Sequence, residues 1–474
     1  MLTYELKKLP GMPLYEALYR HIRDDILSGR LQPGEKLPSK RALATNLEVS
    51  KITVEGAYEQ LLSEGFIYSV EKVGYFVETT QQTRPDTAAA GEKTLQNFQK
   101  NAATKSDKPA KVFTKNETAI IDLTANFSAR FPFSVWSRLQ REVMLDLGEK
   151  LLSPVPNQGL PELRRAISRQ LLEFRGMEVD PENILIGAGT DFLYNLLIQL
   201  LGRDKIYAVE EPGYSKIRLI YAAGGVRCDG APMDKQGVRP DALKNADILH
   251  ISPSHHFPSG IVTTAGRRQA LLQWAKAGEK WIIEDDYDTE FRFSARPTAA
   301  MYTMDRAGKV IYMNTFSKTL ASPIRISYMV LPPLLMEKFR KTLGFYSCTV
   351  PSFEQYTLAR FLEEGHFEKH INRMRKLYKN RRNRILAAIE NSPSSHKMRI
   401  LEENAGLHFL LKIQSELSDE ALTRQFALHG IKVRTLGSYY HDPAPKEATH
   451  TLVINYSALN EQETEALEKI FRGV

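Results

Sequence analysis

Short runs of apolar and β-branched residues alternate with longer segments of helical periodicity from Ile120 onward. A helix is expected over Thr263–Ala277, between two of these runs. Strands that alternate with helices are typical of a parallel sheet whose crossover connections are helices. The alternation therefore predicts an α/β body built on a mostly parallel sheet. The runs are NILIGAG, KIYAVE, DILHIS, KWIIEDD and KVIYMNT.

Other changes in hydrophobic pattern divide the chain. For a length of 474 residues, two or three domains are expected. Residues 81–118 carry almost no apolar pattern, as in a flexible polar linker, and their expected root-mean-square span is roughly 30–35 Å. After Pro332 a long helical section to about Glu390 precedes mixed strand and helix material. The predicted organisation is a head over 1–80, the linker over 81–118, and a body over 119–474, with a large domain over about 119–331 and a small α+β domain over about 332–474.

The net charge of +8 permits a nucleic-acid partner but does not require one. Residues 1–80 hold 10 Lys or Arg and 11 Asp or Glu, so the head is not basic overall. An argument for DNA binding must therefore rest on where its charges lie.

The sequence lacks the features of secreted, disulfide-rich and membrane-spanning chains. Its first residues, MLTYELKKLPG, have no apolar core followed by a small-residue cleavage site. The most apolar long segment, Phe192–Leu201, is too short to span a bilayer and contains Asn195 and Gln199. Cys228 and Cys348 are too few for a disulfide framework, and nothing beside them has metal-ligand spacing. We expect a cytoplasmic protein without a metal site or a membrane partner.

The head has the pattern of a winged helix-turn-helix. An amphipathic helix is indicated by one apolar stripe, and Ser39 and Ser50 each stand at the N-cap position of a short helix. Two such helices that meet at a tight turn form helix-turn-helix geometry. The expected elements are helices over Leu14–Leu27, Lys40–Asn46 and Lys51–Ser63 and a two-stranded wing of Phe66–Ser69 and Tyr75–Val77.

The amino-acid sequence of these elements is more specific than their pattern of helices and strands. That pattern alone would also fit a small helical domain that binds a protein. LPSKRALATNLEVSKITVEGAYEQLLSEGFIY and GYFV closely resemble the GntR-type winged helix over nearly all of the head. Lys40, Arg41 and Lys51 can supply phosphate contacts, whereas Glu55 and Glu59 are expected to face away from DNA. The resemblance implies that DNA is approached by Ser39, Lys40, Arg41, Ser50, Lys51 and Thr53 and by the wing residues Lys72, Gly74 and Tyr75.

A lysine framed by small hydroxyl residues follows a predicted strand in NTFSKTLASPIRISYMVLP. Lys318 can form a Schiff base with an aldehyde cofactor, and Arg325, seven positions on, can bind a phosphate. Upstream, IIEDDYDTEFRF places Asp285, Asp286 and Tyr287 after a buried strand, at the end where α/β folds bind ligands. A carboxylate there can hold a pyridine nitrogen protonated. The two acids could instead be a metal pair, but no His or third acid is spaced to complete one.

Three further loops can contribute to the same site. LIGAGTDFLY is a strand, a small-residue turn and a helix start, where the N–H groups of Ala188, Gly189 and Thr190 can receive a phosphate. It is neither a Walker A loop nor a full dinucleotide fingerprint, so nucleotide binding is disfavoured. EEPGY offers Tyr214 for stacking on a planar ring, and SPSHHFPSG places His256 near the ring edge.

This ordered set resembles the fold-type I aminotransferases from about residue 120 onward, and with the head it resembles the MocR family of transcription regulators. The resemblance implies a pyridoxal-phosphate-binding body, a DNA operator as partner and a head-to-tail homodimer. It implies Lys318 as the Schiff-base lysine, with Asp285 at the pyridine nitrogen and Tyr287 at the phenolic oxygen. Asp285 is preferred to Asp286 because it leaves Tyr287 two positions on, as in the family pattern. By the same resemblance Tyr214 stacks on the ring, His256 borders it, and the phosphate is bound by Ala188, Gly189, Thr190, Ser317 and Arg325.

The sequence departs from the family pattern at two places. His256 stands where many relatives have Gln. On the last core strand, TLVINYS, Val453 stands where aminotransferases usually place the arginine that binds the substrate carboxylate. Arg434 is a weak candidate to replace it. An ordinary α-amino-acid substrate is therefore disfavoured.

A strongly basic run, HINRMRKLYKNRRNR, covers His370–Arg384. On a helix it is basic on more than one face, with Met374, Leu377 and Ile385 turned toward the core. It is either a solvated helix or a second contact with DNA phosphate. The second interpretation would explain how a protein with a neutral head gains the affinity that phosphate neutralisation provides.

Two functions remain open. The first is a regulator whose body senses an amino compound, or pyridoxal phosphate itself, and retains at most residual imine chemistry. The second is a working aminotransferase with an autoregulatory DNA-binding head. The intact helix-turn-helix and the missing strand arginine favour the first. A purely structural body would not explain why every cofactor contact is in place.

Overall fold

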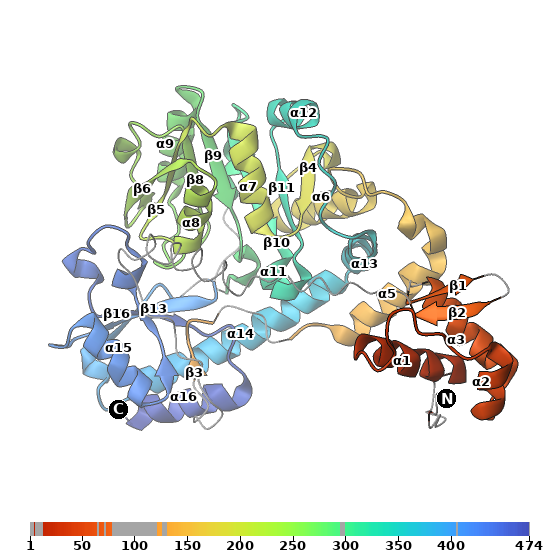
Figure 1. Ribbon diagram of the computed structural model, residues 1–474. Coiled ribbons are helices and arrows are strands. Elements are labelled where there is room, and N and C mark those ends of the chain that lie inside the picture. The colour runs from red at the N-terminus through yellow and green to blue at the C-terminus, as the bar shows by residue number, and fades with distance from the viewer. Residues whose placement is uncertain are drawn as a thin grey trace, which may run out of the picture. The chain divides into compact units, whose positions relative to one another are not determined.

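The computed structural model describes Tyr4 and residues 13–63, 66–70, 73–77, 121–125, 130–293, 299–403 and 406–473. The chain divides into two compact units, Met1–Val112 and Phe113–Val474. Figure 1 labels the helices and strands of both. Within the described ranges, no helix is long and apolar enough to cross a membrane.

The first unit is a helix-turn-helix with a wing. Its helices have the predicted bounds, and they bury one stripe each, including Leu18, Leu43 and Val54. Ser39 Oγ accepts the Ala42 N–H at 3.2 Å, which satisfies a donor at a helix start that would otherwise lack a partner. The wing is an antiparallel pair whose first strand lies one residue beyond the predicted bounds. The elements are α1 (Leu14–Leu27), α2 (Lys40–Asn46), α3 (Lys51–Ser63), β1 (Ile67–Val70) and β2 (Gly74–Val77).

The second unit contains an eight-stranded sheet of order β4-β11-β10-β9-β8-β5-β6-β7. Its central strands, β10 to β6 in that order, are parallel, and β11 and β7 run antiparallel to their neighbours. All five apolar runs of the sequence form strands here, as the mostly parallel sheet requires. The strands are β4 (Ile184–Gly187), β5 (Ile206–Glu211), β6 (Arg227–Asp234), β7 (Gly237–Val238), β8 (Ile248–Ile251), β9 (Trp281–Asp285), β10 (Val310–Thr315) and β11 (Ser327–Val330).

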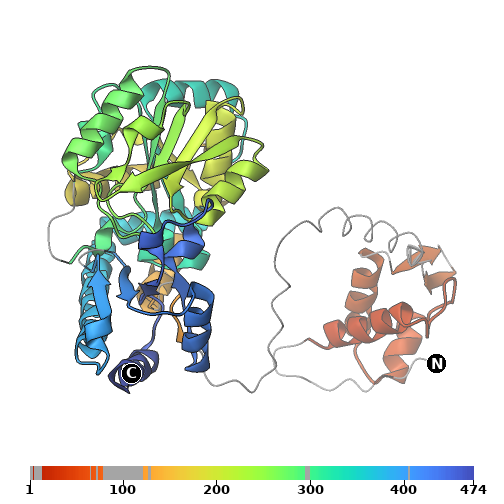
Figure 2. The same ribbon diagram turned by 90° about the vertical axis from the view of Figure 1, so that its left-hand side faces the viewer.

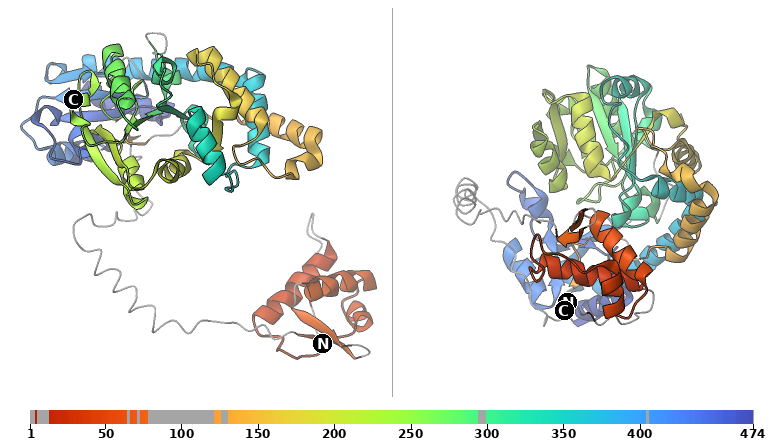
Figure 3. Two further views of the ribbon diagram at one scale, coloured as in Figure 1. Left: turned by 90° about the horizontal axis from the view of Figure 1, so that it is seen from above. Right: turned by 45° about the vertical axis from the view of Figure 1, so that its right-hand side comes forward.

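Helices cover both faces of this sheet (Figures 1 and 3). Side chains alternate between faces along a strand, so Ile282 packs with the α9 residue Leu271, whereas Ile283 packs with the α7 residue Leu197. The alternation determines which face of the sheet each side chain points to, up to the ends of the strands. The helices of this region are α5 (Phe133–Leu147), α6 (Pro161–Arg175), α7 (Thr190–Leu201), α8 (Ser215–Ala223), α9 (Ala265–Lys276), α10 (Met301–Met304), α11 (Phe316–Thr319), α12 (Pro333–Thr342) and α13 (Ser352–Glu363).

A smaller sheet of order β12-β13-β16-β15 forms the rest of the unit, joined to the large sheet through the 25-residue helix α14. The boundary expected near 332 differs from the structure, because α12 packs on α7 and α13 on α5 and α6. The short strand β3 also pairs with β14 of the small domain. The elements are β3 (Ile121–Asp122), α14 (His366–Glu390), β12 (Met398–Leu401), β13 (His408–Ile413), α15 (Asp419–Leu428), β14 (Ile431–Lys432), β15 (Arg434–Thr435), β16 (Thr451–Asn455) and α16 (Glu461–Gly473).

Candidate functional site

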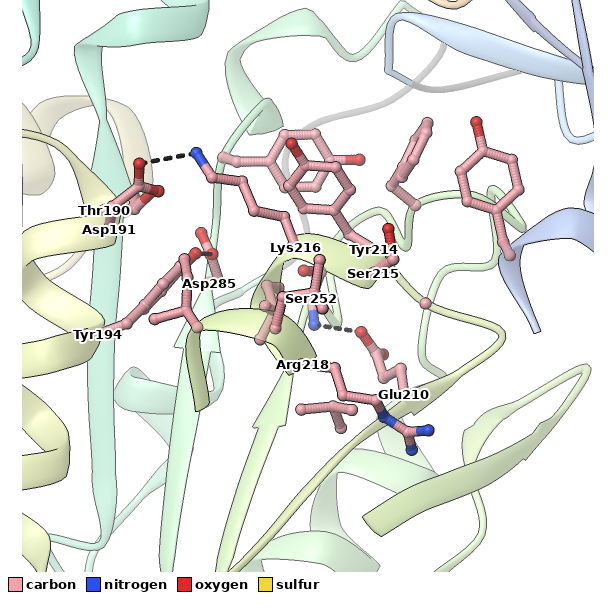
Figure 4. A pocket seen from close by; sticks show the side chains of 18 of the residues that line it. Thr190, Asp191, Tyr194, Glu210, Tyr214, Ser215, Lys216, Arg218, Ser252 and Asp285 are labelled. Carbon is pink, nitrogen blue, oxygen red and sulfur yellow. Dashed lines mark hydrogen bonds and ion pairs between the residues drawn. The ribbon is translucent and has the colours of Figure 1, made fainter. Parts of the chain in front are cut away.

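A cavity of about 530 Å³ opens at the carboxyl ends of the parallel strands β5, β8, β9 and β10. This edge is where open α/β sheets bind ligands, and the volume lies within the usual range of ligand pockets, about 300–1,000 Å³. Figure 4 shows part of the lining seen from close by. Of the cofactor residues predicted from the sequence, those that line it are Thr190, Tyr214, His256, Asp285, Tyr287, Ser317, Lys318 and Arg325.

Lys318 lies on the single turn of α11, directly after β10. Thr315 begins that turn: its Oγ1 accepts the Ser317 N–H at 3.1 Å and the Ser327 hydroxyl at 2.7 Å. Burial lowers the pKa of Lys318 to about 8, and Asp288 and Asp285 act in the opposite direction. The amine is therefore closer to its neutral, nucleophilic form than an exposed lysine would be.

Asp285 ends β9 with one carboxylate oxygen held by the protein and the other without a partner. Oδ2 accepts the Tyr194 hydroxyl and lies 3.5 Å from His250 Nε2. His250 Nδ1 is 2.7 Å from the Tyr221 hydroxyl, so with Tyr221 as donor the Nε2 proton faces Asp285. Asp285 Oδ1 is buried and has no hydrogen-bond partner. Buried acceptors in folded proteins nearly always have a hydrogen-bond partner, so this oxygen is available to a donor within the cavity.

Asp286 points to the opposite face of the strand and belongs to a different network. It forms a 2.7 Å ion pair with Arg175, whose side chain is 5% exposed, and accepts the Tyr312 hydroxyl at 2.8 Å. The period of two along β9 therefore gives the adjacent acids different surroundings. No group of three or more potential metal ligands occurs among the described residues, so the metal-pair alternative has no third ligand there.

Glu210 and His256 lie side by side in the wall of the cavity. Glu210 Oε2 accepts the Ser252 N–H at 2.9 Å and lies 3.5 Å from His256 Nε2. Burial raises the pKa of Glu210 to about 8, with a smaller contribution from Asp285, and burial lowers the pKa of His256 to about 3. Sequence reasoning missed Glu210, although its position two residues before the proline of EEPGY placed it at a strand end.

The two tyrosines predicted at the cofactor differ in exposure. Tyr287 is held beside His255, with its hydroxyl 3.4 Å from Nδ1, and burial raises its pKa well above the ordinary value. Tyr214 is half exposed, and its ring meets Phe257 edge to face at 6.1 Å between centroids. Tyr287 thus has a fixed position at the base of the cavity, and Tyr214 lies at its mouth.

Two of the predicted phosphate contacts lie outside the lining of the cavity. Ala188 and Gly189 do not line the cavity: the Ala188 N–H donates to Thr349 Oγ1 at 2.9 Å and the Gly189 N–H to the Gly187 carbonyl at 2.8 Å. Gly189 instead permits a close approach, because a Cβ there would collide with the Arg325 guanidinium. The N–H groups of these two residues are therefore already used within the fold.

Those side chains surround a carboxylate in the structure. Arg325 lies 3.4 Å from Asp191, and Lys216 binds the same carboxylate at 2.7 Å (Figure 4). Thr190 and Ser317 line the cavity at the same end. Lys216 escaped sequence reasoning because a lysine at the start of a helix is ordinarily solvated. The pairing with Asp191 depends on a contact between α7 and α8.

The small domain supplies one wall of the cavity through Ser438, Tyr439, Tyr440 and His441. The Gly213 N–H donates to the Tyr439 carbonyl at 3.1 Å, and the His441 N–H donates to Glu211 at 2.5 Å. The loop therefore joins the two domains at the cavity mouth.

Arg434 does not line this cavity. It is exposed and lies opposite Val453 in the register of β15 and β16. Val453 itself is buried, which leaves the predicted arginine position of the last core strand apolar. Burial raises the pKa of Tyr439, and the neighbouring Arg434 acts against that shift. Arg434 is thus separated from the cavity by Tyr439, a lining residue.

The predicted DNA-contacting residues of the head lie at the starts of α2 and α3 and on the wing, except for Lys72, which is outside the described residues. Ser50 Oγ accepts the Thr53 N–H at 3.1 Å, and Lys40 lies over the Tyr75 ring at 5.5 Å. Glu55 lies beside two of the predicted DNA-contacting lysines. It pairs with Lys51 at 3.2 Å and Lys40 at 3.9 Å, because one helical turn brings it beside Lys51.

Comparison with known proteins gives two family matches along the chain. Bacterial regulatory proteins of the gntR family match residues 14–77, and aminotransferase class I and II matches residues 118–470. The HTH-type transcriptional regulator YdeL of Bacillus subtilis is 34% identical over 478 residues, covering 99% of this chain and 98% of its own. The probable rhizopine catabolism regulatory protein MocR of Rhizobium meliloti is 30% identical, covering 95% and 91%.

The fold of the body is shared with solved aminotransferases. The structure of Pyrococcus horikoshii kynurenine aminotransferase in complex with PMP matches 81% of this chain and 93% of that chain. Its TM-score is 0.64 at 22% sequence identity. The likeness establishes the architecture on which the cavity is built.

Proposed function

Because this chain belongs to the MocR-type transcription regulators, in which a GntR-type DNA-binding head is fused to an aminotransferase class I and II body, we propose that its body holds pyridoxal phosphate and senses a small amino compound, or pyridoxal phosphate itself. Binding in the body would then change the affinity of the head for its operator. The observation that carries the proposal is Asp285: one oxygen anchored, the other buried and without a partner, in the cavity that also contains Lys318.

The residues present fit this cofactor. Asp285 Oδ1 would accept the pyridine N–H, Tyr287 would contact the phenolic oxygen, and Tyr214 would cover the ring. Thr190, Ser317 and Arg325 would bind the phosphate, which would replace Asp191 as the partner of Arg325. When bound, the cofactor supplies an aldehyde for covalent capture by Lys318 and an electron sink for amino compounds.

The rest of the cavity is suited to a compound with an anionic group. Lys216 lies on the large-domain side, and His441 and Tyr439 lie on the small-domain side. A ligand there would contact both domains, and a ligand that binds two domain arrangements unequally shifts the balance between them. Arg434, beside Tyr439, would reach such a ligand only after a movement of that loop.

The second candidate, a working aminotransferase with a DNA-binding head, rests on the same intact cofactor residues. Transamination requires a substrate carboxylate held so that the reacting bond is aligned, and misplacement by about 1 Å can cost about 100-fold in rate. Buried Val453 offers no such contact. We therefore propose that chemistry on the bound compound is residual.

We also propose a head-to-tail homodimer. Large apolar side chains are exposed on and beside α5, including Phe133 at 72%, Leu145 at 78% and Leu152 at 76%. A second copy of the body would bury them, and exposed apolar patches commonly mark such interfaces.

The proposed function is tested by measuring operator affinity of the full chain with and without pyridoxal phosphate and with amino acids, amines and dipeptides. At least one compound should change both the cofactor absorbance and the operator affinity, without sustained turnover when 2-oxoglutarate or pyruvate is the acceptor. Arg41→Ala is the control: it should weaken DNA binding and leave the absorbance change intact. Turnover at ordinary enzymatic speed would instead establish the aminotransferase alternative.

Covalent capture of pyridoxal phosphate should depend on pH in a way set by Lys318. The neutral amine is the attacking form, and burial lowers the pKa of this amine to about 8. The capture rate should therefore rise with pH through about 8 and become level above it. A rate that continued to rise toward about 10.4, the ordinary lysine pKa, would contradict the assignment. Stopped-flow absorbance between pH 6 and about 10.5 makes the measurement.

A further inference from the structure

Helix α14 contains the whole basic run His370–Arg384, and the structure divides its residues into two groups. One group is used inside the fold. Arg381 donates to the Tyr456 and Ser457 carbonyls at 2.9 Å, Arg382 donates to the Glu403 carbonyl at 2.7 Å, and Arg384 pairs with Glu461 and Glu468. Arg375 donates to the Glu290 carbonyl, and His370 is bonded to the Thr319 carbonyl. These residues hold α14 against its neighbours.

The other group forms a continuous stripe. Between residues 369 and 383 every exposed side chain of α14 is Lys, Arg or Asn. At about 100° per residue they fall within about 120° of one face and extend over about 21 Å of the helix. Figure 2 shows α14 in light blue along the outer edge of the body. The stripe consists of Lys369, Asn372, Arg373, Lys376, Lys379, Asn380 and Asn383.

Within the described residues, no ion pair joins any of the four cations of the stripe to a carboxylate. Neighbours along the stripe stand three or four positions apart, a spacing at which like charges destabilise a helix. The same helix gives Arg384 two glutamates, so α14 does not lack acids in its surroundings. An uncompensated stripe that works against helix stability needs an external anion to explain it.

We propose that the stripe of α14 binds the phosphate backbone of the DNA held by the head, as a second, sequence-independent contact. Lysine, arginine and asparagine are side chains that bind phosphate oxygens, and a straight row suits a polyanion better than a single small anion. DNA is the polyanion supplied by the DNA-binding function of this family, on which this inference rests. The covalent link to the head raises the local concentration of DNA phosphate at the body.

The charge distribution of the head also favours DNA as the partner of the stripe. The head has 10 basic and 11 acidic residues, and Glu55 partly neutralises Lys40 and Lys51 on the DNA-facing side. Much of the affinity of proteins for DNA comes from phosphate neutralisation. The body stripe supplies cations that the head lacks.

The test compares two triple variants of the full chain. The first is Arg373→Gln/Lys376→Gln/Lys379→Gln. The second removes the same charge from exposed positions elsewhere on the body, Lys244→Gln/Lys276→Gln/Lys338→Gln. Fluorescence anisotropy gives the affinity for arbitrary-sequence duplexes of about 60 and about 12 base pairs as a function of salt, where each phosphate contact contributes about 0.9 to the slope.

We expect the stripe variant to lower the salt slope on the long duplex by about 2 to 3, and the control variant to leave it unchanged. On the short duplex, which the head alone can cover, the two variants should behave alike. The charge-conserving variant Arg373→Lys of the parent chain should keep the parental salt slope. Equal slopes for both variants on the long duplex would overturn the stripe while leaving the head as the DNA-binding part. Loss of DNA binding by the unmodified chain would instead contradict the DNA-binding function itself. Unchanged pyridoxal phosphate capture shows that each variant is folded.

Discussion

Lys318→Ala is expected to abolish the covalent attachment of pyridoxal phosphate to the protein. The amine lies on the turn that follows β10, buried and shifted toward its neutral form, and it lines the same cavity as Asp285. Noncovalent binding should survive in part, because Arg325, Thr190 and Ser317 are unchanged. Reduction with borohydride followed by mass spectrometry should find the cofactor on one peptide of the parent chain and on none of the variant.

Lys216→Ala is the matched control for that experiment, since it removes another amine from the same cavity. It should leave the adduct in place. An adduct that persisted in Lys318→Ala would show that a different lysine is used. If the regulator proposal holds, Lys318→Ala should also lose the response of operator affinity to amino compounds while retaining operator binding.

Arg175→Met is expected to destabilise the body by about 3–5 kcal/mol. Arg175 and Asp286 are 5% and 0% exposed in a 2.7 Å ion pair, so the substitution leaves a buried carboxylate without its counter-charge. Two more buried acids lie close by: burial and then Asp286 raise the pKa of both Glu284 and Glu290 to about 7. Loss of the Arg175 guanidinium makes Glu290 harder to ionise, because Arg175 lowers its pKa in the parent. Unfolding of the protein by guanidinium chloride, monitored by circular dichroism, measures the loss of stability.

The pH dependence of this loss has a definite sign. In the parent, burial raises the pKa of Glu290 to about 7 and Arg175 acts against that shift, so loss of Arg175 raises the folded-state pKa of Glu290 further above its unfolded value, and stability is lost as pH rises through it. The deficit relative to the parent should therefore shrink as pH falls below 7. Arg175→Met/Asp286→Asn should recover part of the loss at neutral pH. A stability deficit that was the same at every pH would indicate lost packing rather than an uncompensated buried charge.

The sequence was informative where a side chain's role follows from its own strand or helix. Alternation predicted the strands, whereas the preference for Asp285 over Asp286 came from the family resemblance. The structure gives the two acids different surroundings. The helices of the head followed from caps and stripes. These are local signals, so they can be read without knowing which elements meet.

Roles that depend on contacts between distant elements could not be predicted in this way. Burial within the folded body raises the pKa of Glu210, and Tyr194 and His250 reach Asp285 from α7 and β8. Ala188 and Gly189 had the right turn for phosphate, but Thr349 and the turn itself already use their N–H groups. The basic residues of α14 could be divided into packed and exposed ones only once the packed face of the helix was known.

The pairing of β3 with β14 determines where the head is tethered. The chain that leaves the head enters the body at Ile121, and this residue is hydrogen-bonded into the small domain rather than the large one. A rotation of the small domain about the cavity would carry the attachment point of the linker with it. In the homodimer proposed above, rotation of both small domains would therefore change the separation between the two points at which the linkers begin.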